Sequence, residues 1–277
     1  MKRAALINDL SGVGRCSLTV ALPIVSACGY ECAVLPTAVL SNHTGFDSYT
    51  FYDFTDHMPD YIKSWEKLGL TFDVIYSGFF GSAAQAKITN DFMLKFGKNS
   101  LKLVDPVLGD NGVLYDTCGR EILVHMRDLV SKANIITPNL TELCALCGTD
   151  YPEKKITLDR VEEMCKNLGA ECIVVTGLEN ASVSEIEKGR ISNLVYQNGK
   201  VCLTDNKKFP VTYCGTGDVF ASVICGVALS AKSIAESVKI AADFVEICAQ
   251  KTYNNNGDKL FGMQFEDKLG LLKEYCL

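Results

Sequence analysis

The sequence has no long run of apolar residues and no long run of basic residues. Near the N-terminus the apolar stretch covers only Ala4 to Ile7, and no basic run is longer than the two residues of Lys207-Lys208. A secretory signal needs roughly 7–15 apolar residues in a row and a membrane span roughly 18, so we expect neither. With 27 Lys and Arg against 33 Asp and Glu, the formal net charge is −6, which disfavours binding to nucleic acid or to an anionic membrane. We therefore expect a cytoplasmic protein without nucleic-acid or membrane partners.

Proline and tryptophan are also scarce, at 7 and 1 of 277 residues. The remaining composition, with 48% hydrophobic and 22% charged residues, is typical of a globular chain and excludes a disordered or fibrous one. No linker, repeat or low-complexity tract divides the chain. We predict a single domain over residues 1–277.

Cysteine, in contrast, is plentiful. The 13 cysteines are an odd number and lie mostly among aliphatic neighbours, as Cys225 and Cys248 do. This pattern indicates reduced, buried thiols and no disulfide framework. Cys144 and Cys147 form a Cys-x-x-Cys pair, but no second pair or His pair follows at zinc spacing. Helix packing is therefore the favoured interpretation of this pair, with metal or redox use as the alternative.

Short β-branched runs alternate with longer segments of helical periodicity. The predicted strands are 4–7, 32–35, 74–76, 101–104, 134–136 and 172–175, and the predicted helices between them are 18–28, 61–68, 83–96, 119–130 and 158–168. Such a βαβ series predicts an α/β fold whose sheet is mostly parallel, with helices on both faces. Asn198-Gly199, between strands 191–196 and 201–204, predicts an antiparallel hairpin at one edge. Three more helices are expected at 217–230, 234–251 and 264–276.

The loop after the first strand is polar and contains Asn8, Asp9, Ser11, Gly12 and Gly14. Loops at the carboxyl ends of parallel strands are where such sheets bind ligands. This loop lacks the third glycine of a dinucleotide-binding motif, and the chain has no Gly-x-x-x-x-Gly-Lys-Ser/Thr motif. Two interpretations stay open: a site for a small polar substrate, or a β-to-α turn capped by Asn and Asp side chains.

The strongest local signal is Gly215-Thr216-Gly217-Asp218, which leads directly into an apolar helix. The two glycines let backbone N–H groups converge, and the helix dipole adds partial positive charge, so the segment can cradle an anion such as phosphate. A carboxylate beside an anion site is unfavourable unless chemistry requires it, for example to accept a proton from an attacking hydroxyl. This combination suggests phosphoryl transfer. A tight turn followed by an acid that complements the helix dipole explains the segment equally well.

Two further strands are followed by acids. Asp105 and Asp110 follow the 101–104 strand, while Asn139 and Glu142 lie three residues apart, on one face of the helix that begins after the next strand. Mg²⁺ keeps much of its water and takes one or two carboxylates plus phosphate oxygens, so both loops suit it. Asn139 and Glu142 taken alone fit a helix capping box better. Thr176, after the 172–175 strand, suits a phosphate or a ribose.

Six segments together resemble the pyridoxal kinases of the ribokinase superfamily. They span nearly the whole chain in the family's order and spacing: Ser41-Asn42-His43-Thr44-Gly45, Ser77-Gly78, Asp105-Pro106-Val107-Leu108-Gly109-Asp110, Thr137-Pro138-Asn139 with Glu142, Thr176-Gly177 and Gly215-Thr216-Gly217-Asp218. Gly-x-Gly-Asp marks only the superfamily, which includes sugar and hydroxymethylpyrimidine kinases. Ser-Asn-His-Thr together with the Asp-Pro-Val-Leu-Gly-Asp loop is more specific to vitamin B6 kinases.

The resemblance implies a ribokinase-like fold and ATP-dependent phosphorylation of the hydroxymethyl group of pyridoxal, pyridoxine or pyridoxamine, in vitamin B6 salvage. Asp218 would be the catalytic base, and Gly215, Thr216 and Gly217 would form the anion hole. Positions that match the family's ATP site are Asp105, Asp110, Thr137, Asn139, Glu142, Thr176, Gly177 and Thr216. Asp105 and Glu142 would lie near Mg²⁺, with K⁺ as a further cation, and the family is usually dimeric. Asp110-Asn111-Gly112 would belong to a mobile flap over the nucleotide.

On the vitamin side, the resemblance implies a pocket that includes Asn8, Asp9, Ser11, His43, Thr44, Phe79 and Asp218. Asn8 stands where many pyridoxal kinases have a serine, and Phe79 replaces an aromatic residue with a hydroxyl group. These departures bear on the choice among the three vitamers, or between them and hydroxymethylpyrimidine. Cys214 is similar to a cysteine with which related kinases trap an aldehyde, but theirs lies on a flexible lid.

Two other functions stay open from the sequence. The enzymatic alternative is a hydroxymethylpyrimidine or other small-alcohol kinase of the same superfamily. The alternative from another class is a catalytically silent regulator that binds the ligand without turnover. The intact Asp218 and both glycines of its loop argue against the regulator.

Overall fold

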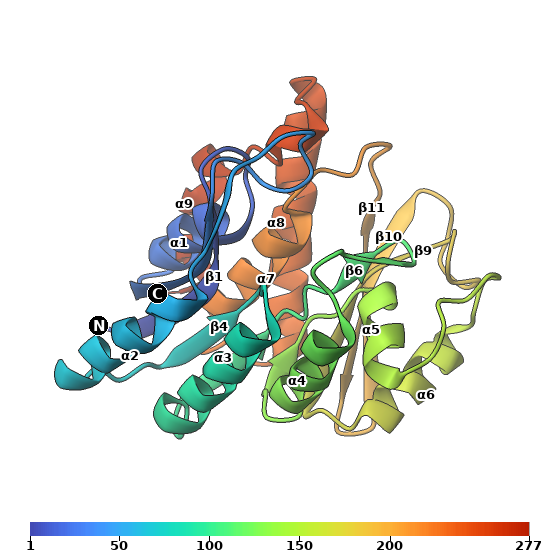
Figure 1. The fold of residues 1–277 in the computed structure, drawn as a ribbon. Coiled ribbons are helices and arrows are strands. Elements are labelled where there is room, and N and C mark those ends of the chain that lie inside the picture. The colour runs from blue at the N-terminus through green and yellow to red at the C-terminus, as the bar shows by residue number, and fades with distance from the viewer. Residues whose placement is uncertain (277) are drawn as a thin grey trace.

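One nine-stranded sheet organises the chain (Figure 1). The computed structural model describes residues 1–276, so residue 277 of the predicted domain lies outside the described residues. The strand order is β11-β10-β9-β8-β5-β4-β1-β2-β3. Its parallel strands are β1 (Arg3–Ser11), β2 (Glu31–Leu40), β4 (Val74–Ser77), β5 (Leu101–Val104), β8 (Ile135–Ile136) and β9 (Cys172–Glu179). The predicted α/β fold with a mostly parallel sheet is confirmed.

Both edges of the sheet are antiparallel. At one edge, β10 (Arg190–Gln197) pairs with β9 and with β11 (Lys200–Lys207). Asn198 and Gly199 between them have φ of 53° and 70°, the left-handed values that a two-residue hairpin turn requires. The predicted hairpin is therefore confirmed. At the other edge, β3 (Phe51–Asp53) pairs antiparallel with β2, which the sequence did not indicate because three residues are too few to show alternation.

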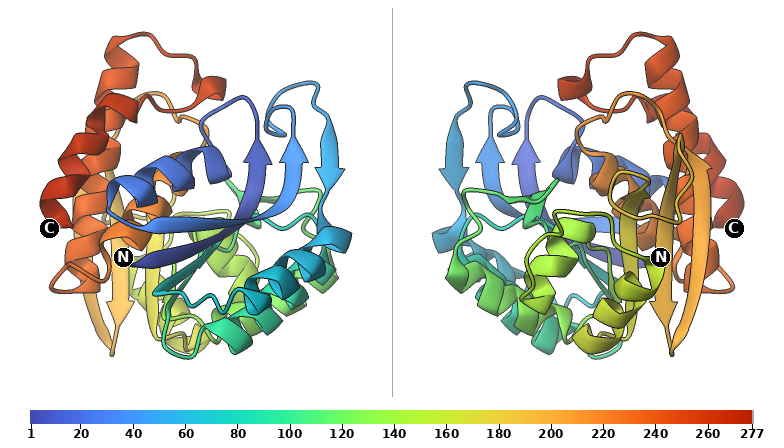
Figure 2. Two further views of the ribbon diagram at one scale, coloured as in Figure 1. Left: turned by 90° about the vertical axis from the view of Figure 1, so that its left-hand side faces the viewer. Right: turned by 90° about the vertical axis from the view of Figure 1, so that its right-hand side faces the viewer.

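Helices cover both faces of the sheet, as the predicted series requires (Figures 1 and 2). One face carries α1 (Ser17–Ala27), α7 (Thr216–Val227), α8 (Ile234–Asn254) and α9 (Leu269–Leu272). The other carries α2 (Met58–Lys67), α3 (Ala83–Phe96), α4 (Arg120–Val130), α5 (Leu140–Cys147) and α6 (Leu158–Leu168). Alternate residues of β1 enter the two cores: Leu6 belongs to the first and Ile7 to the second.

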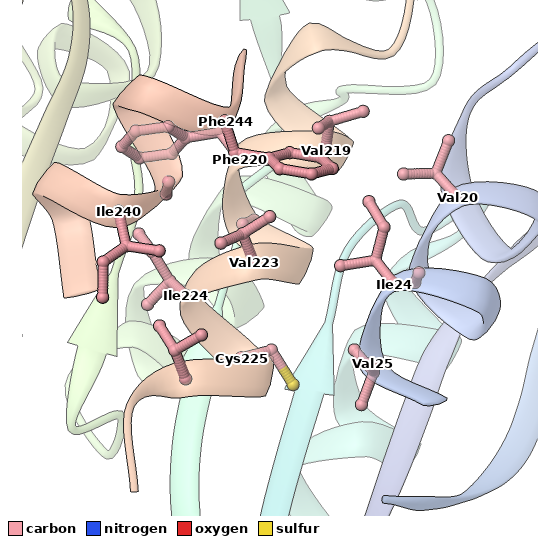
Figure 3. Close-up of a cluster of buried hydrophobic side chains, with 14 of the residues drawn as sticks. Val20, Ile24, Val25, Val219, Phe220, Val223, Ile224, Cys225, Ile240 and Phe244 are labelled. Atoms are coloured by element: carbon pink, nitrogen blue, oxygen red, sulfur yellow. The ribbon is translucent and has the colours of Figure 1, made fainter. Parts of the chain in front are cut away.

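Helix α7 is held between α1 and α8 (Figure 3). Val20 and Ile24 of α1 approach it from one side and Phe244 of α8 from the other, and every residue of α7 from Val219 to Val227 is buried. A helix that is apolar on all sides is stable only inside a core. The N-terminus of α7 is therefore fixed relative to the sheet.

The predicted helix over 264–276 is wrong. This segment forms two 3₁₀ turns, Glu266–Lys268 and Lys273–Tyr275, around the short α9. Gly270 lowers the helix propensity in its middle, and the buried Phe265 and Leu272 attach the segment to the core at two separate points.

Several short elements complete the chain. The Asp110 flap is a small hairpin of β6 (Gly109–Asp110) and β7 (Val113–Leu114), and further 3₁₀ turns lie at Thr55–His57 and Lys259–Phe261. All 13 cysteines are unpaired, as expected, and only Cys202 is exposed. Within residues 1–276, no helix has the length and apolar character needed to cross a membrane.

Candidate active site

The loop before α7 has the conformation of an anion cradle. Gly215 is the residue before the first helical turn and has a φ of 72°, and a Cβ there would lie 1.9 Å from the carbonyl oxygen of Arg15. Only glycine fits this position. The Thr216 hydroxyl donates to the carbonyl of Tyr213 at 2.7 Å, and Gly217 has open space around it. Since no side chain caps α7, the N–H groups of its first turn are left for another acceptor.

Asp218 lies in this first turn, and its carboxylate faces the backbone N–H of Ser17 and the side chain of Asn8. Ser17 has a φ of 50°, a conformation that non-glycine residues rarely adopt and that concentrates at functional sites. Burial, with Asp105 and Asp9 nearby, raises the pKa of Asp218 to about 7. A carboxylate of this pKa is well matched to accept a proton near neutral pH.

The end of β1 is fixed by hydrogen bonds of its own. Asn8 Oδ1 accepts from the backbone N–H groups of Phe79 at 2.8 Å and Asp9 at 3.0 Å, and the Ser11 hydroxyl donates to Asp9 Oδ2 at 2.9 Å. Burial raises the pKa of Asp9. Asn8, Asp9 and Ser11 therefore lie in the last part of strand β1, where its register with β2 shifts, and not in the predicted loop or in a flexible turn. Asp9 and Asn8 also act on Asp218.

His43 joins three loops. Gly45 N–H donates to its Nδ1 at 3.1 Å, so Nε2 carries the proton and donates to the carbonyl of Leu260 at 2.7 Å. The thiol of Cys214 lies 3.7 Å from Nδ1. A Cβ at Gly14 would lie 2.4 Å from the His43 ring, so glycine is needed there as well. Both ring nitrogens already have protein partners, whereas the neighbouring Thr44 is exposed.

A pair of buried acids lies farther along the same edge of the sheet. Thr137 Oγ1 donates to Asp105 Oδ1 at 2.8 Å, and Glu142 Oε1 accepts from Leu108 N–H at 3.1 Å. Glu142 Oε2 accepts from Asn139 N–H at 2.8 Å while Asn139 Oδ1 accepts from Glu142 N–H at 2.9 Å. This reciprocal pattern is a capping box, so the favoured interpretation of these two residues is confirmed.

The acid pair has the character of a site for a nucleotide-borne cation. Burial raises the pKa of Asp105 to about 6 and, with the charge of Asp105, raises that of Glu142. Neither acid forms an ion pair among the described residues, and residues 1–276 contain no cluster of three or more His, Cys, Asp or Glu that could hold a metal alone. Both features fit Mg²⁺, which takes few carboxylates and completes its shell with water and phosphate oxygens. Because both Glu142 oxygens accept N–H groups, that side chain would act through water.

The remaining predicted residues frame this acid pair. Asn139 Nδ2 donates to the carbonyl of Gly109, and Thr176 N–H donates to the carbonyl of Pro138 at 2.9 Å, which brings the flap and the end of β9 to the same loop. Gly177 is exposed with a φ of 68°. Asp110 is exposed at the flap turn, where its carboxylate accepts from the N–H and the side-chain amide of Asn111.

Sequence reasoning missed Tyr115. It follows the flap hairpin, and burial together with the charges of Glu142, Asp110 and Asp218 raises its pKa. Tyr115 is 45% exposed, and its N–H donates to the carbonyl of Leu108 at 2.9 Å, beside the acid pair. No motif marks this residue, because a single tyrosine in a loop has no periodicity or spacing to distinguish it.

The family model for phosphomethylpyrimidine kinase matches residues 30–261. The chain belongs to this family. Pyridoxal kinase PdxY of Granulibacter bethesdensis is 30% identical over 221 residues, which cover 76% of this chain and 75% of that protein.

Two solved structures are similar to this chain. One is a putative phosphomethylpyrimidine kinase from Bacteroides thetaiotaomicron that was crystallised with pyridoxal. It is 38% identical, has a TM-score of 0.91, and matches over 98% of this chain and 95% of that chain. The pyridoxal kinase of Lactobacillus plantarum is 29% identical with a TM-score of 0.89, over 98% of this chain and 96% of its own. The predicted resemblance is confirmed, and the family's fold accounts for the sheet order described above.

Proposed function

We propose that this chain is a pyridoxal kinase, which transfers the γ-phosphoryl group of ATP to the hydroxymethyl group of a vitamin B6 vitamer. The observation that carries the proposal is Asp218, a carboxylate with a pKa of about 7 in the first turn of a helix whose N–H groups no side chain caps. The similarity to pyridoxal kinases and to a family member crystallised with pyridoxal supports the choice of substrate. It disfavours hydroxymethylpyrimidine as the main substrate, and the intact site disfavours a silent regulator.

In the proposed reaction, the hydroxymethyl oxygen of the vitamer attacks the γ-phosphorus while Asp218 accepts its proton. The bond between the γ-phosphorus and the bridging oxygen breaks, and ADP leaves with the electron pair of that bond. The N–H groups of Gly215, Thr216 and Gly217 donate to the oxygens of the transferring group. Preorganised donors of this kind usually supply the largest share of such catalysis.

The acid pair Asp105 and Glu142 is proposed to hold Mg²⁺, Glu142 through water. When bound, Mg²⁺ neutralises charge on the phosphates. Thr137 orients Asp105 through the hydrogen bond described above. The proposed ATP site further includes Asp110, Asn139, Thr176, Gly177 and Thr216. K⁺ is the second cation that the family resemblance implies, and an assay with and without it tests that role.

The vitamer site is proposed to lie between the β1 loop and the His43 loop, beside Asp218. Asn8, Asp9, Ser11, Thr44 and Phe79 would line it. His43 would shape the pocket with its ring, because neither of its nitrogens is free to bind a ligand. We further propose one kinase domain, a cytoplasmic location and a homodimer. The short edge strand β3 offers unpaired backbone groups for a partner, and the mass in solution tests the dimer.

The proposal predicts alcohol-dependent consumption of ATP. With ATP and Mg²⁺, ADP should form faster with one of pyridoxal, pyridoxine and pyridoxamine than with hydroxymethylpyrimidine or a sugar. The Asp218→Asn variant should lose turnover by about 10²- to 10⁴-fold, the usual contribution of a positioned base, while still binding ATP. Faster turnover of hydroxymethylpyrimidine would favour the other kinase, and tight vitamer binding without ADP would favour the regulator. Near-normal turnover of Asp218→Asn would remove its assignment as the base.

A further inference from the structure

Three buried polar atoms without hydrogen-bond partners belong to residues in the neighbourhood of Asp218. They are Asn8 Nδ2, the Tyr76 hydroxyl and Ser222 Oγ. Their residues are 2%, 1% and 0% exposed, respectively. Buried polar groups that lack a partner are rare in folded proteins, so each requires a physical reason. We call these three side chains the polar floor.

The register of the sheet places the members of the floor on one face. Tyr76 of β4 lies opposite Leu6 of β1 and Leu103 of β5. Side chains alternate between the faces of a sheet, so Asn8 and Asp105, each two residues beyond those partners, share the face of Tyr76. Along the strand direction, Tyr76 thus lies two residues before the level of Asn8 and Asp105, on the same face of the sheet.

The residue that follows β4 is a glycine. Gly78 is two residues beyond Tyr76 and on the same face, and a Cβ there would lie 2.4 Å from Asn8 Nδ2. No side chain of β4 therefore covers the phenol on the side toward the active site. The carboxylates that act on the phenol are Asp105 and Asp218, and the hydroxyl that faces it belongs to Ser222.

Helix α7 supplies the opposite side of the same space. Asp218 and Ser222 are four residues apart and therefore lie one above the other on one face of α7. The Asn8 amide faces the Asp218 carboxylate. Asp218 consequently has three potential donors near it: Asn8 of β1, Tyr76 of β4 and Ser222 of its own helix. Among the described residues, Tyr76 is the largest fully buried side chain.

We propose that Tyr76 is a positioning residue for phosphoryl transfer: its phenolic hydroxyl, which has no hydrogen-bond partner among the described residues, donates to the Asp218 carboxylate when the substrate hydroxyl arrives and holds it there during the transfer. Tyr76 acts only through Asp218 and does not touch the substrate. This inference rests on the proposed function and adds to it a residue outside the segments that carry the family resemblance. Burial raises the pKa of Tyr76 well above its ordinary value, so the phenol keeps its proton and remains a donor.

The Tyr76→Phe variant tests the inference because it removes one oxygen and keeps the ring. We expect kcat to fall about tenfold to a hundredfold, the rate equivalent of one hydrogen bond to a charged group. The KM values for ATP and for the vitamer should stay at the wild-type level, because neither ligand contacts the phenol. Loss of packing alone would instead lower the melting temperature without this split between kcat and KM.

The matched control is Tyr30→Phe. Tyr30 is 4% exposed, belongs to the same core, and also has a hydroxyl without a partner. It directly precedes β2, at the end of the sheet opposite to Asp218. The same chemical change there should leave kcat and both KM values unaltered.

A second variant, Ser222→Ala, tests the floor if Tyr76→Phe fails to fold, and it should lower kcat alone by a smaller factor. Three results would overturn the inference. The first is a wild-type kcat in either folded variant, the second is a rise in KM that accounts for the whole loss of activity, and the third is an equal loss of kcat in Tyr30→Phe. Failure of the proposed function gives a different result, since the wild-type chain would then form no ADP with any vitamer.

Discussion

Asp218 shows at the scale of one residue how the fold prepares a chemical group. A carboxyl group in water has a pKa near 4 and is a weak base at neutral pH. The apolar surroundings of α7 and the neighbouring acids Asp105 and Asp9 raise the pKa of Asp218 to about 7. The N–H of Ser17 and the amide of Asn8 oppose this rise.

This pKa predicts the pH dependence of turnover. The base must be ionised to accept a proton, so kcat/KM for the vitamer, which reports the enzyme before the vitamer binds, should be at its plateau above the pKa and fall as the pH drops through about 7. Below the pKa, kcat/KM should fall about tenfold for each pH unit. Initial rates from pH 5.5 to 9, at limiting vitamer concentration, provide the measurement. A rate that is constant across this range would contradict the assignment of Asp218 as the base.

Residue patterns predicted most of the site but not its floor. Asp218, Asp105 and Glu142 could be found because each follows a strand or a glycine pair, a position that the order of elements makes recognisable. Tyr76 gave no such signal, since an aromatic residue within a β-branched strand is expected in the core. Its hydroxyl became informative only when the structure showed that it is buried without a partner, on the sheet face that Asn8 and Asp105 share.

At the scale of elements, the anion loop depends on a close approach between two segments. Gly215 at the start of α7 lies against the carbonyl of Arg15, which precedes α1. Any side chain at Gly215 would separate α7 from the loop before α1 and shift the N–H groups of the first turn. Gly217, two residues later, has open space around it.

The two glycines therefore form a matched pair of tests. Gly215→Ala should lower the free energy of unfolding by about 2 kcal/mol or more and lower turnover, because it combines a left-handed φ with a backbone clash. Gly217→Ala should leave the melting temperature at or slightly above its wild-type value, since alanine favours the helix. Chemical denaturation of both variants and steady-state kinetics check this. Equal stability of the two variants would contradict the close approach.

The elements that the sequence failed to predict share a physical cause. The β3 strand and the flap strands β6 and β7 span only two or three residues, so no periodicity can develop in them. The segment over 264–276 has apolar residues at helical spacing, yet separate core contacts and Gly270 divide it into short turns. Longer segments such as α3 were predicted because both their periodicity and their ends are visible in the sequence.

At the scale of the whole molecule, the active site lowers the stability of the fold. Asp218, Asp105, Asp9 and Glu142 all have raised pKa values in the folded chain. Between the ordinary pKa near 4 and the raised values, the folded chain binds more protons than the unfolded chain. Its stability must therefore decrease as the pH rises through this window, up to about 7.

Removing one of these charges should stabilise the protein. We expect Asp218→Asn to raise the free energy of unfolding at pH 8 by roughly 2 kcal/mol, because the amide cannot ionise. Near pH 4, where the carboxyl group is largely protonated in the unfolded chain as well, the difference should largely disappear. Urea denaturation of both proteins at the two pH values measures this. A variant that is less stable than the wild type at pH 8 would contradict the raised pKa of Asp218.

The β10–β11 hairpin has an exposed turn at the end of the sheet opposite to the proposed chemistry. Gln197, at the end of β10, lies opposite Cys172 at the start of β9, whereas the proposed ligands meet the other end of that strand. A peptide grafted between Asn198 and Gly199 would project away from the catalytic rim. The protein can therefore be tethered to a bead or a sensor surface through this turn with its ligand entrance facing the solvent.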